Sequence, residues 1–425
     1  MKKIAVSFGL IAVGTASLQA AYTLGSDSMQ TSKVWSLSGS LRGFYDDNYN
    51  TAPSGTPSKR GSYGFEVSPS ISLNVPLDQT DIGVRYTYGL YFYQDRLNLH
   101  PSQNPVDQTH QLDLWVNHAF TESWQASIQD SFVSAQDPGL VNGGTPLRTE
   151  GNNINNVGSI KLDTQWTRLL GSEFGYQNTF VDYQNHGGTA IAPSFSGLLD
   201  RDENLAWLSL NWQLTPTLKP LVGYKFGLIN YIGGEPIAPG SVSDNRDNRS
   251  QYFYVGAQYD PLANLIISVE AGGQYVDYYH PAAGLSATTQ LQPYANLSAT
   301  YTYLPGSYVQ AGFTQTQSAT DVSAPTASGQ VTESLNTSTG YASINHQFSP
   351  KLTGSVIGKV QYSTFNEGSF ANSAETWYNF GLNLAYSFNN HVSTEIGYNY
   401  DNLDSNVPGQ KYDRNRVYLG VTATY

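Results

Sequence analysis

The sequence predicts an all-β fold, in which about eighteen antiparallel strands close into an up-and-down barrel that spans a membrane. Three observations lead to this prediction. Apolar residues alternate with small or polar ones from Val34 to the end of the chain, the alternating segments are long, and long connections take turns with short ones. Alternation with a period of two is typical of strands with one apolar and one polar face. A helical period nowhere persists for more than about two turns.

The composition of the 425 residues excludes several other classes of protein. The mean hydropathy of −0.36 is too polar for a bundle of transmembrane helices. Charged and aromatic residues each make up 13% of the chain, which is the opposite of a disordered composition. The chain has no cysteine, so disulfides, thiolate nucleophiles and Cys-type zinc sites are excluded. The net charge of −12 argues against nucleic acid as a partner, because phosphate binding needs a basic face.

Residues 1–20 predict a secretory signal peptide. Lys2 and Lys3 supply the positive start, Ile4 to Ala16 form an apolar stretch, and small residues end at Ala20. An anchor helix is the alternative, but an apolar stretch of about thirteen residues is short for a bilayer. We therefore expect a secreted chain with a short periplasmic tail at 21–33 and a barrel at 34–425.

Eighteen segments carry the alternating pattern, and sixteen is the alternative count. In one of them, Tyr378 to Phe388, large apolar residues alternate with residues such as Asn379 and Gly381. Most segments run to roughly 10–14 residues, which is long enough to cross a bilayer when tilted. The predicted strands are 34–45, 64–76, 81–94, 110–120, 124–135, 157–167, 173–182, 204–214, 219–231, 250–259, 265–278, 290–303, 308–318, 334–348, 351–365, 376–388, 392–401 and 412–425.

The connections between these strands alternate between long segments, such as 232–249, and tight turns, such as 304–307. An up-and-down barrel has this arrangement, with loops on one rim and turns on the other. A soluble β-propeller or β-sandwich is the alternative. Long strands, sparse charge and aromatic residues at strand ends, such as Tyr45 and Phe120, favour the membrane barrel. A secreted closed barrel predicts the outer membrane, with long outer loops and short periplasmic turns.

The last predicted strand, Tyr412 to Tyr425, has alternating apolar positions and ends in an aromatic residue. It resembles the closing strand of outer-membrane barrels. The chain after the leader resembles the β-barrel porin families found near extracellular-polysaccharide and exosortase genes. The resemblance implies an outer-membrane barrel, and it implies that Tyr425 belongs to the signal read by the barrel-assembly machinery. It implies location and fold more than a substrate.

The sequence contains no motif for a catalytic, cofactor or metal site. Glycine-rich phosphate loops and the G-x-S-x-G turn are absent, and the histidines lack zinc-ligand spacing. We therefore expect no enzymatic activity, cofactor or metal, and an outer-membrane hydrolase is the weakest alternative. The acidic clusters, such as Asp46-Asp47 and Asp200 to Glu203, are interpreted as solvated loops; binding of calcium or of anionic lipid headgroups is the alternative.

Charged residues on the inward faces of the strands give the best functional prediction. Isolated charges in a dry interior would cost several kcal/mol each, so these residues predict water inside the barrel. A barrel of about eighteen strands is also too wide for side chains to fill. An interior plugged by ion pairs that cross it is the alternative. The predicted pore-lining residues are Arg42, Glu66, Arg85, Lys161, Asp163, Lys225, Glu270, Lys359, Glu395 and Arg416.

The pattern as a whole predicts a porin-like channel for passive diffusion of small hydrophilic solutes across the outer membrane. Its other partners would be membrane lipid and the barrel-assembly machinery, and a homo-oligomer is left open. The alternative is a non-conducting or export-associated barrel that serves extracellular polysaccharide or surface assembly. Arg42 and Arg416 are expected to lie near one another on the inner wall and to face Glu270 across the bore.

Overall fold

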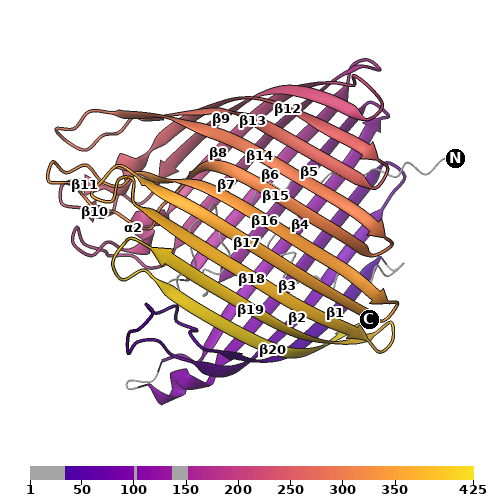
Figure 1. The fold of residues 1–425 in the computed structure, drawn as a ribbon, viewed down its shortest axis with the longest axis horizontal. Helices are drawn as coiled ribbons and strands as arrows, with labels where there is room; N and C mark the ends of the chain where they lie inside the picture. Colours follow the sequence, from indigo (N-terminus) through magenta and orange to yellow (C-terminus); the bar gives the residue numbers. More distant parts are fainter. Residues whose placement is uncertain (1–33, 100–102, 136–151) are drawn as a thin grey trace.

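The computed structural model describes residues 34–99, 103–135 and 152–425, so the predicted signal peptide and periplasmic tail lie outside the described residues. Within these ranges, one antiparallel sheet of 18 strands closes on itself (Figure 1). The closure joins β1 (Trp35–Asp46) to β20 (Tyr412–Thr424), which pair from Ser38↔Thr424 to Asp46↔Arg416. The predicted barrel and its strand number are confirmed.

Each strand of the sheet pairs with the next one along the chain, except that β9 pairs with β12. Most bounds lie within a few residues of the prediction, and β5 and β13 match it. The remaining strands of the sheet are β2 (Ser62–Pro76), β3 (Thr80–Tyr93), β4 (Val106–Thr121), β5 (Trp124–Ala135), β6 (Asn153–Gln165), β7 (Leu170–Tyr183), β8 (Arg201–Trp212), β9 (Leu218–Tyr231), β12 (Asn248–Leu262), β13 (Leu265–Tyr278), β14 (Thr288–Leu304), β15 (Ser307–Ser318), β16 (Ser334–Ser349), β17 (Leu352–Asn366), β18 (Ala374–Ser387) and β19 (Val392–Ser405).

The long loops contain short elements that the sequence did not predict. A two-stranded hairpin, β10 (Pro236–Ala238) and β11 (Ser241–Val242), lies between β9 and β12. The other elements are the helix α2 (Phe195–Leu199) and the 3-10 helices η1 (Gln94–Asn98) and η2 (Ser243–Arg246). None of the helices in the described part of the chain is long and apolar enough to cross a membrane. In Figure 1, α2, β10 and β11 lie at one end of the barrel, and tight turns and the C-terminus lie at the other.

The two faces of the sheet differ in polarity, as the alternation predicts. Outward residues such as Val255, Leu419 and Phe253 are large, apolar and exposed, which suits contact with lipid.

On the inner face, aromatic rings lie over glycines of the neighbouring strand. A Cβ on Gly83 would lie 1.8 Å from the ring of its register partner Trp115. Because glycine leaves this space, the ring lies along the wall instead of projecting into the bore. The same pairing joins Trp207 to Gly175, Tyr254 to Gly223, Tyr341 to Gly312 and Tyr418 to Gly397.

Candidate pore lining and outer cap

Arg42 on β1 is the centre of a charged group on the inner wall. Its Nε lies 2.6 Å from Glu395 Oε1, and its Nη1 lies 3.3 Å from Glu66 Oε1. Gly420 of β20 is the register partner of both Arg42 and Glu395. A Cβ on Gly420 would lie 2.6 Å from Arg42 Cγ, so the glycine lets the arginine cross over β20 to reach Glu395 on β19.

Lys225 on β9 forms a second group. Its Nζ lies 3.2 Å from Glu270 Oε2 on β13 and donates a 2.6 Å hydrogen bond to Tyr294 Oη. Tyr294 in turn donates to Glu270, at 2.7 Å. The ammonium also lies 4.7 Å from the ring centre of Tyr254, within the range of a cation–π contact. The charge of Lys225 is therefore balanced by its neighbours on the wall.

Two further groups lie on β3–β4 and β6–β7. Arg85 Nε lies 3.1 Å from Asp113 Oδ2, and Lys161 Nζ lies 3.1 Å from Asp163 and 3.6 Å from Glu173. The side chains of Asp163 and Arg85 are 46% and 40% exposed, more than those of the charged residues around Arg42 and Lys225. These two side chains are consequently the best placed of the predicted wall charges to meet a solute.

Arg416 and Lys359 have different surroundings. Arg416 and its neighbour Arg414 both lie 2.9 Å from Oδ2 of the buried Asp46. Lys359 is only 5% exposed, and its Nζ lies 4.7 Å from the ring centre of Trp377. The expected proximity of Arg42 and Arg416 is wrong, because the barrel register pairs Arg42 with Gly420 and places Arg416 four positions further along, opposite Asp46. Glu270 pairs with Lys225 instead of facing these arginines as a free charge.

Nine of the ten predicted residues, all but Lys359, form ion pairs with described residues, and these pairs follow the wall. Each joins residues on one strand, on adjacent strands or on strands with one strand between them. None of these pairs between described residues crosses the bore. Sequence reasoning missed three of the partners, namely Asp46, Asp113 and Glu173. Asp113 and Glu173 alternate with outward apolar residues inside predicted strands, so the same pattern could have identified them.

The loops 184–200, 232–247 and 319–333 pack together into what we call the outer cap. Its core contains Leu198 and Leu199 of α2, Ile237 and Ala238 of β10, and Ala319 and Val331 of the third loop, all buried. Tyr183, an inward residue at the outer end of β7, packs against this core. The cap is therefore in contact with the inner face of the barrel.

Arg246 joins the three loops of the cap. It is fully buried, and its guanidinium donates hydrogen bonds to the carbonyl oxygens of Leu198 (3.1 Å), Thr320 (3.1 Å) and Val322 (2.6 Å). One side chain of the second loop thus satisfies carbonyls of both other loops. Since buried carbonyls need a donor, the cap depends on this residue.

The family described as "Putative beta-barrel porin 2" matches residues 37–425. The chain belongs to this porin family. The match confirms the predicted family, and this porin lies in the outer membrane. The link to polysaccharide genes stays a prediction. No curated protein matches the chain.

Several solved barrels are similar to this porin in structure. Acinetobacter baumannii OccAB4 is 13% identical, with 92% of this chain and 99% of that chain covered and a TM-score of 0.44. Pseudomonas aeruginosa OpdO is 14% identical, with 92% and 97% covered and a TM-score of 0.44. Pseudomonas aeruginosa OccK9 (OpdG) is 13% identical, with 92% and 98% covered and a TM-score of 0.45.

Two other predictions for this porin concern its last residue and its metal sites. The exposed ring of Tyr425 lies 5.5 Å from that of Trp35, at the turn end of the barrel. Its role in recognition by the assembly machinery stays a prediction. Within residues 34–99, 103–135 and 152–425, no group of three or more histidine and carboxylate side chains could hold a metal ion.

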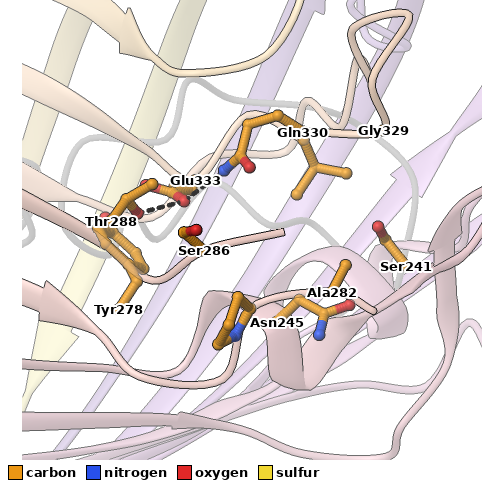
Figure 2. A pocket seen from close by; sticks show the side chains of 11 residues that line it. Ser241, Asn245, Tyr278, Ala282, Ser286, Thr288, Gly329, Gln330 and Glu333 are labelled. Carbon is orange, nitrogen blue, oxygen red and sulfur yellow. Dashed lines mark hydrogen bonds between the residues drawn. The ribbon is translucent and has the colours of Figure 1, made fainter. Parts of the chain in front are cut away.

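Glu333 gives the cap of this porin a pH dependence. It accepts hydrogen bonds from Thr288 (2.6 Å) and Gln330 (2.7 Å), as Figure 2 shows. Burial raises the pKa of its carboxyl from 4.5 to about 7. Because the folded cap holds this proton more tightly than the unfolded loop, the stabilisation is complete below the unfolded pKa and is lost as the pH rises through about 7.

We therefore expect the cap loops to be better protected at about pH 6 than at about pH 8. The measurement is hydrogen exchange of residues 319–333, corrected for the intrinsic pH dependence of exchange. Glu333→Gln should keep high protection at both pH values. Burial also raises the pKa of Asp200, to about 6, so that carboxyl contributes mainly below this range. Equal pH dependence in the wild type and Glu333→Gln would show that another group titrates.

Proposed function

We propose that this porin is a channel for passive diffusion of small hydrophilic solutes. The observation that carries the proposal is the course of the ion pairs between described residues, which follow the wall and do not cross the bore. Many other inward positions of the strands are Ser, Thr, Asn, Gln or Gly, which suit a hydrated lumen. Pairing also removes the cost of isolated charges facing one another across the bore.

The outer cap would set the size limit of the channel. Its loops pack on inward residues at the outer ends of the strands, among them Tyr183 on β7 and Leu335 and Phe365 on β16 and β17. A solute entering from outside would have to pass beside this packed structure. The polar wall below it would then offer weak, reversible contacts through exposed side chains such as Arg85 and Asp163.

Conductance of the purified protein in a planar bilayer tests the proposal. We expect discrete conductance steps, together with swelling of proteoliposomes in uncharged sugars at a rate that falls with sugar size. Steps and swelling should both be present, because the proposed path carries neutral solutes as well as ions. Correctly folded, inserted protein that gives neither result would contradict a diffusion channel.

A change at Arg42 should alter the ion preference of the channel. Arg42→Gln leaves Glu66 and Glu395 without their shared cation, so the local charge of the wall, already negative with two carboxylates to one guanidinium, becomes more negative. We expect the reversal potential in a salt gradient to shift toward that of a cation-selective pore. The matched control is the double variant Arg42→Gln with Glu395→Gln, which should recover part of the shift. An unchanged reversal potential in Arg42→Gln would show that this group does not line the conducting path.

A further inference from the structure

The barrel contains an incomplete joint between β14 and β15. Backbone pairing of these strands runs from Leu304↔Ser307 to Ala295↔Gln315 and stops there. β14 continues outward to Thr288, still paired with β13 on its other side. Among the described strands, residues 288–294 of β14 therefore have no ladder partner on the β15 side, although the sheet as a whole closes.

The outer end of β15 departs from the wall and lies against the inner face of β13. β15 stays paired with β16 as far as Ser318↔Leu335. Gln317 contacts two inward residues of β13: its Nε2 donates to Tyr278 Oη, and its Oε1 accepts from Gln274 Nε2 at 3.5 Å. The wall at this point consists of two overlapping edges and not of one continuous ladder. We call the space between residues 288–294 and residues 315–318 and 334–336 the seam.

Side chains bridge the seam where the backbone does not. Asn336 donates to Gln292 Oε1 at 2.9 Å and accepts from Gln315 Nε2 at 2.6 Å. Closer to the outer end, Gln290 Nε2 and Thr288 Oγ1 donate to Glu333, at 3.2 and 2.6 Å. Such bonds can be exchanged by rotation of a side chain, whereas a backbone ladder opens only when the strands separate.

The sequence of β14 suits an open edge. Pro293, near the inner end of the unpaired stretch, has no N–H to give to a neighbouring strand. Sheets confine proline to edges and irregular positions for this reason. The sequence of β14 therefore favours an unpaired edge at this position.

A pocket adjoins the outer end of the seam, between the cap and the β13–β14 connection (Figure 2). Hydroxyl and amide groups line it, together with the carboxyl of Glu333, and none of its lining residues is Lys or Arg. On the lipid side of the seam, Leu291 is 78% exposed and Phe313 is also exposed. The seam therefore connects a hydrogen-bonding interior, with Glu333 as the ionisable group among its described lining residues, to an apolar exterior. The polar residues that line the pocket are Ser241, Asn245, Tyr278, Ser286, Thr288, Gln330 and Glu333.

We propose that the seam binds an uncharged amphiphile from the outer leaflet of the membrane. The hydroxyl-bearing headgroup exchanges hydrogen bonds with the amides of Gln290, Gln292 and Asn336, and the apolar tail lies against Leu291 and Phe313. The carboxyl of Glu333 beside Gln290 disfavours an anionic headgroup, because like charges repel, and the described residues that line the adjoining pocket include no Lys or Arg. This site is separate from the diffusion path through the bore and does not depend on it.

Protection of an introduced cysteine tests the site, since the protein has no cysteine of its own. Thr289→Cys, which changes an exposed residue of the 288–294 segment and keeps all three amides, is reconstituted into vesicles and labelled with a water-soluble maleimide, with octyl glucoside added below its micellar concentration. We expect octyl glucoside to slow labelling several-fold and glucose or octyl sulfate to have much smaller effects. Thr300→Cys is the control, because its strand is fully paired there, and its labelling should not change. Equal slowing at both positions, or at neither, would overturn the proposal.

A cross-link separates this site from the channel. In Gln292→Cys with Asn336→Cys, a short bifunctional thiol reagent should hold the seam closed. We expect the cross-linked protein to lose photolabelling of the 288–294 segment by a photoactivatable alkyl glucoside while its single-channel conductance stays the same. Cross-linking Thr300→Cys with Gln310→Cys, a register pair of the continuous ladder, should leave photolabelling intact. Photolabelling confined to other parts of the barrel would contradict the site, whereas absent conductance in the wild type would contradict only the channel.

Discussion

Arg246→Ala is expected to loosen the outer cap while leaving the barrel folded. The change removes a fully buried side chain and leaves the carbonyl oxygens of Leu198, Thr320 and Val322 without this donor. Each buried unsatisfied carbonyl costs about 1–3 kcal/mol, so the cap should lose on the order of 3 kcal/mol or more. Hydrogen exchange of the three cap loops should rise strongly, and single-channel conductance should become larger or noisier.

Two variants control this experiment. Arg249→Ala removes a largely exposed arginine that pairs with Asp277, so it should change cap protection little. Arg246→Lys keeps a cation but has no planar fork to reach three carbonyls, and it should restore only part of the protection. If exchange of the cap loops in Arg246→Ala equals that of the wild type, the cap does not depend on this residue.

Asp46→Ala should weaken the closure of the barrel between β1 and β20. The carboxyl of Asp46 is fully buried and accepts from Arg414, Arg416 and the Asn48 N–H. Removal of one partner of a buried ion pair costs about 3–5 kcal/mol, because the remaining charges lose their balance. The measurement is electrophoresis in SDS of samples first heated to a series of temperatures. The temperature at which the band of the folded barrel disappears should fall markedly.

Asp404→Ala is the matched control for this change. Asp404 and its partner Lys411 are both more than half exposed, and exposed pairs contribute about 0–1 kcal/mol. The melting temperature of Asp46→Asn should lie between those of Asp46→Ala and Asp404→Ala, since an amide keeps a hydrogen-bonding oxygen but has no charge. A melting temperature of Asp46→Ala as high as that of Asp404→Ala would show that this group does not hold the barrel closed.

The strands were predictable because lipid and water act on opposite faces of every strand. The alternation located all the strands of the sheet, including the exact bounds of β5 (Trp124–Ala135) and β13 (Leu265–Tyr278). The alternation failed to predict the strand bounds at the outer ends of the strands, where both faces are polar or are covered by loops. β4 begins at Val106 and not at residue 110, and β1 includes Asp46, which the prediction placed in a loop.

Contacts between strands were less predictable, because they depend on register. The pattern of one strand shows which face a residue is on but not how far its neighbour is shifted, so Arg42 and Arg416 were expected together. The cap and the seam had weaker signals. Apolar residues such as Leu198, Leu199 and Ile237 inside polar loops point to packing, and Pro293 within a strand points to an edge. These signals have a physical meaning only once the barrel places the segments side by side.

The pairing of charges along the wall has a consequence for how solutes of different size sense the lumen. A one-to-one pair such as Lys225–Glu270, with its members 3.2 Å apart, acts at a distance as a dipole, whose potential falls faster than that of a single charge. Mobile ions shorten its reach further, to about 8 Å at physiological ionic strength. A small ion near the axis would therefore sense little of the wall, whereas a solute wide enough to touch it would meet both signs at close range.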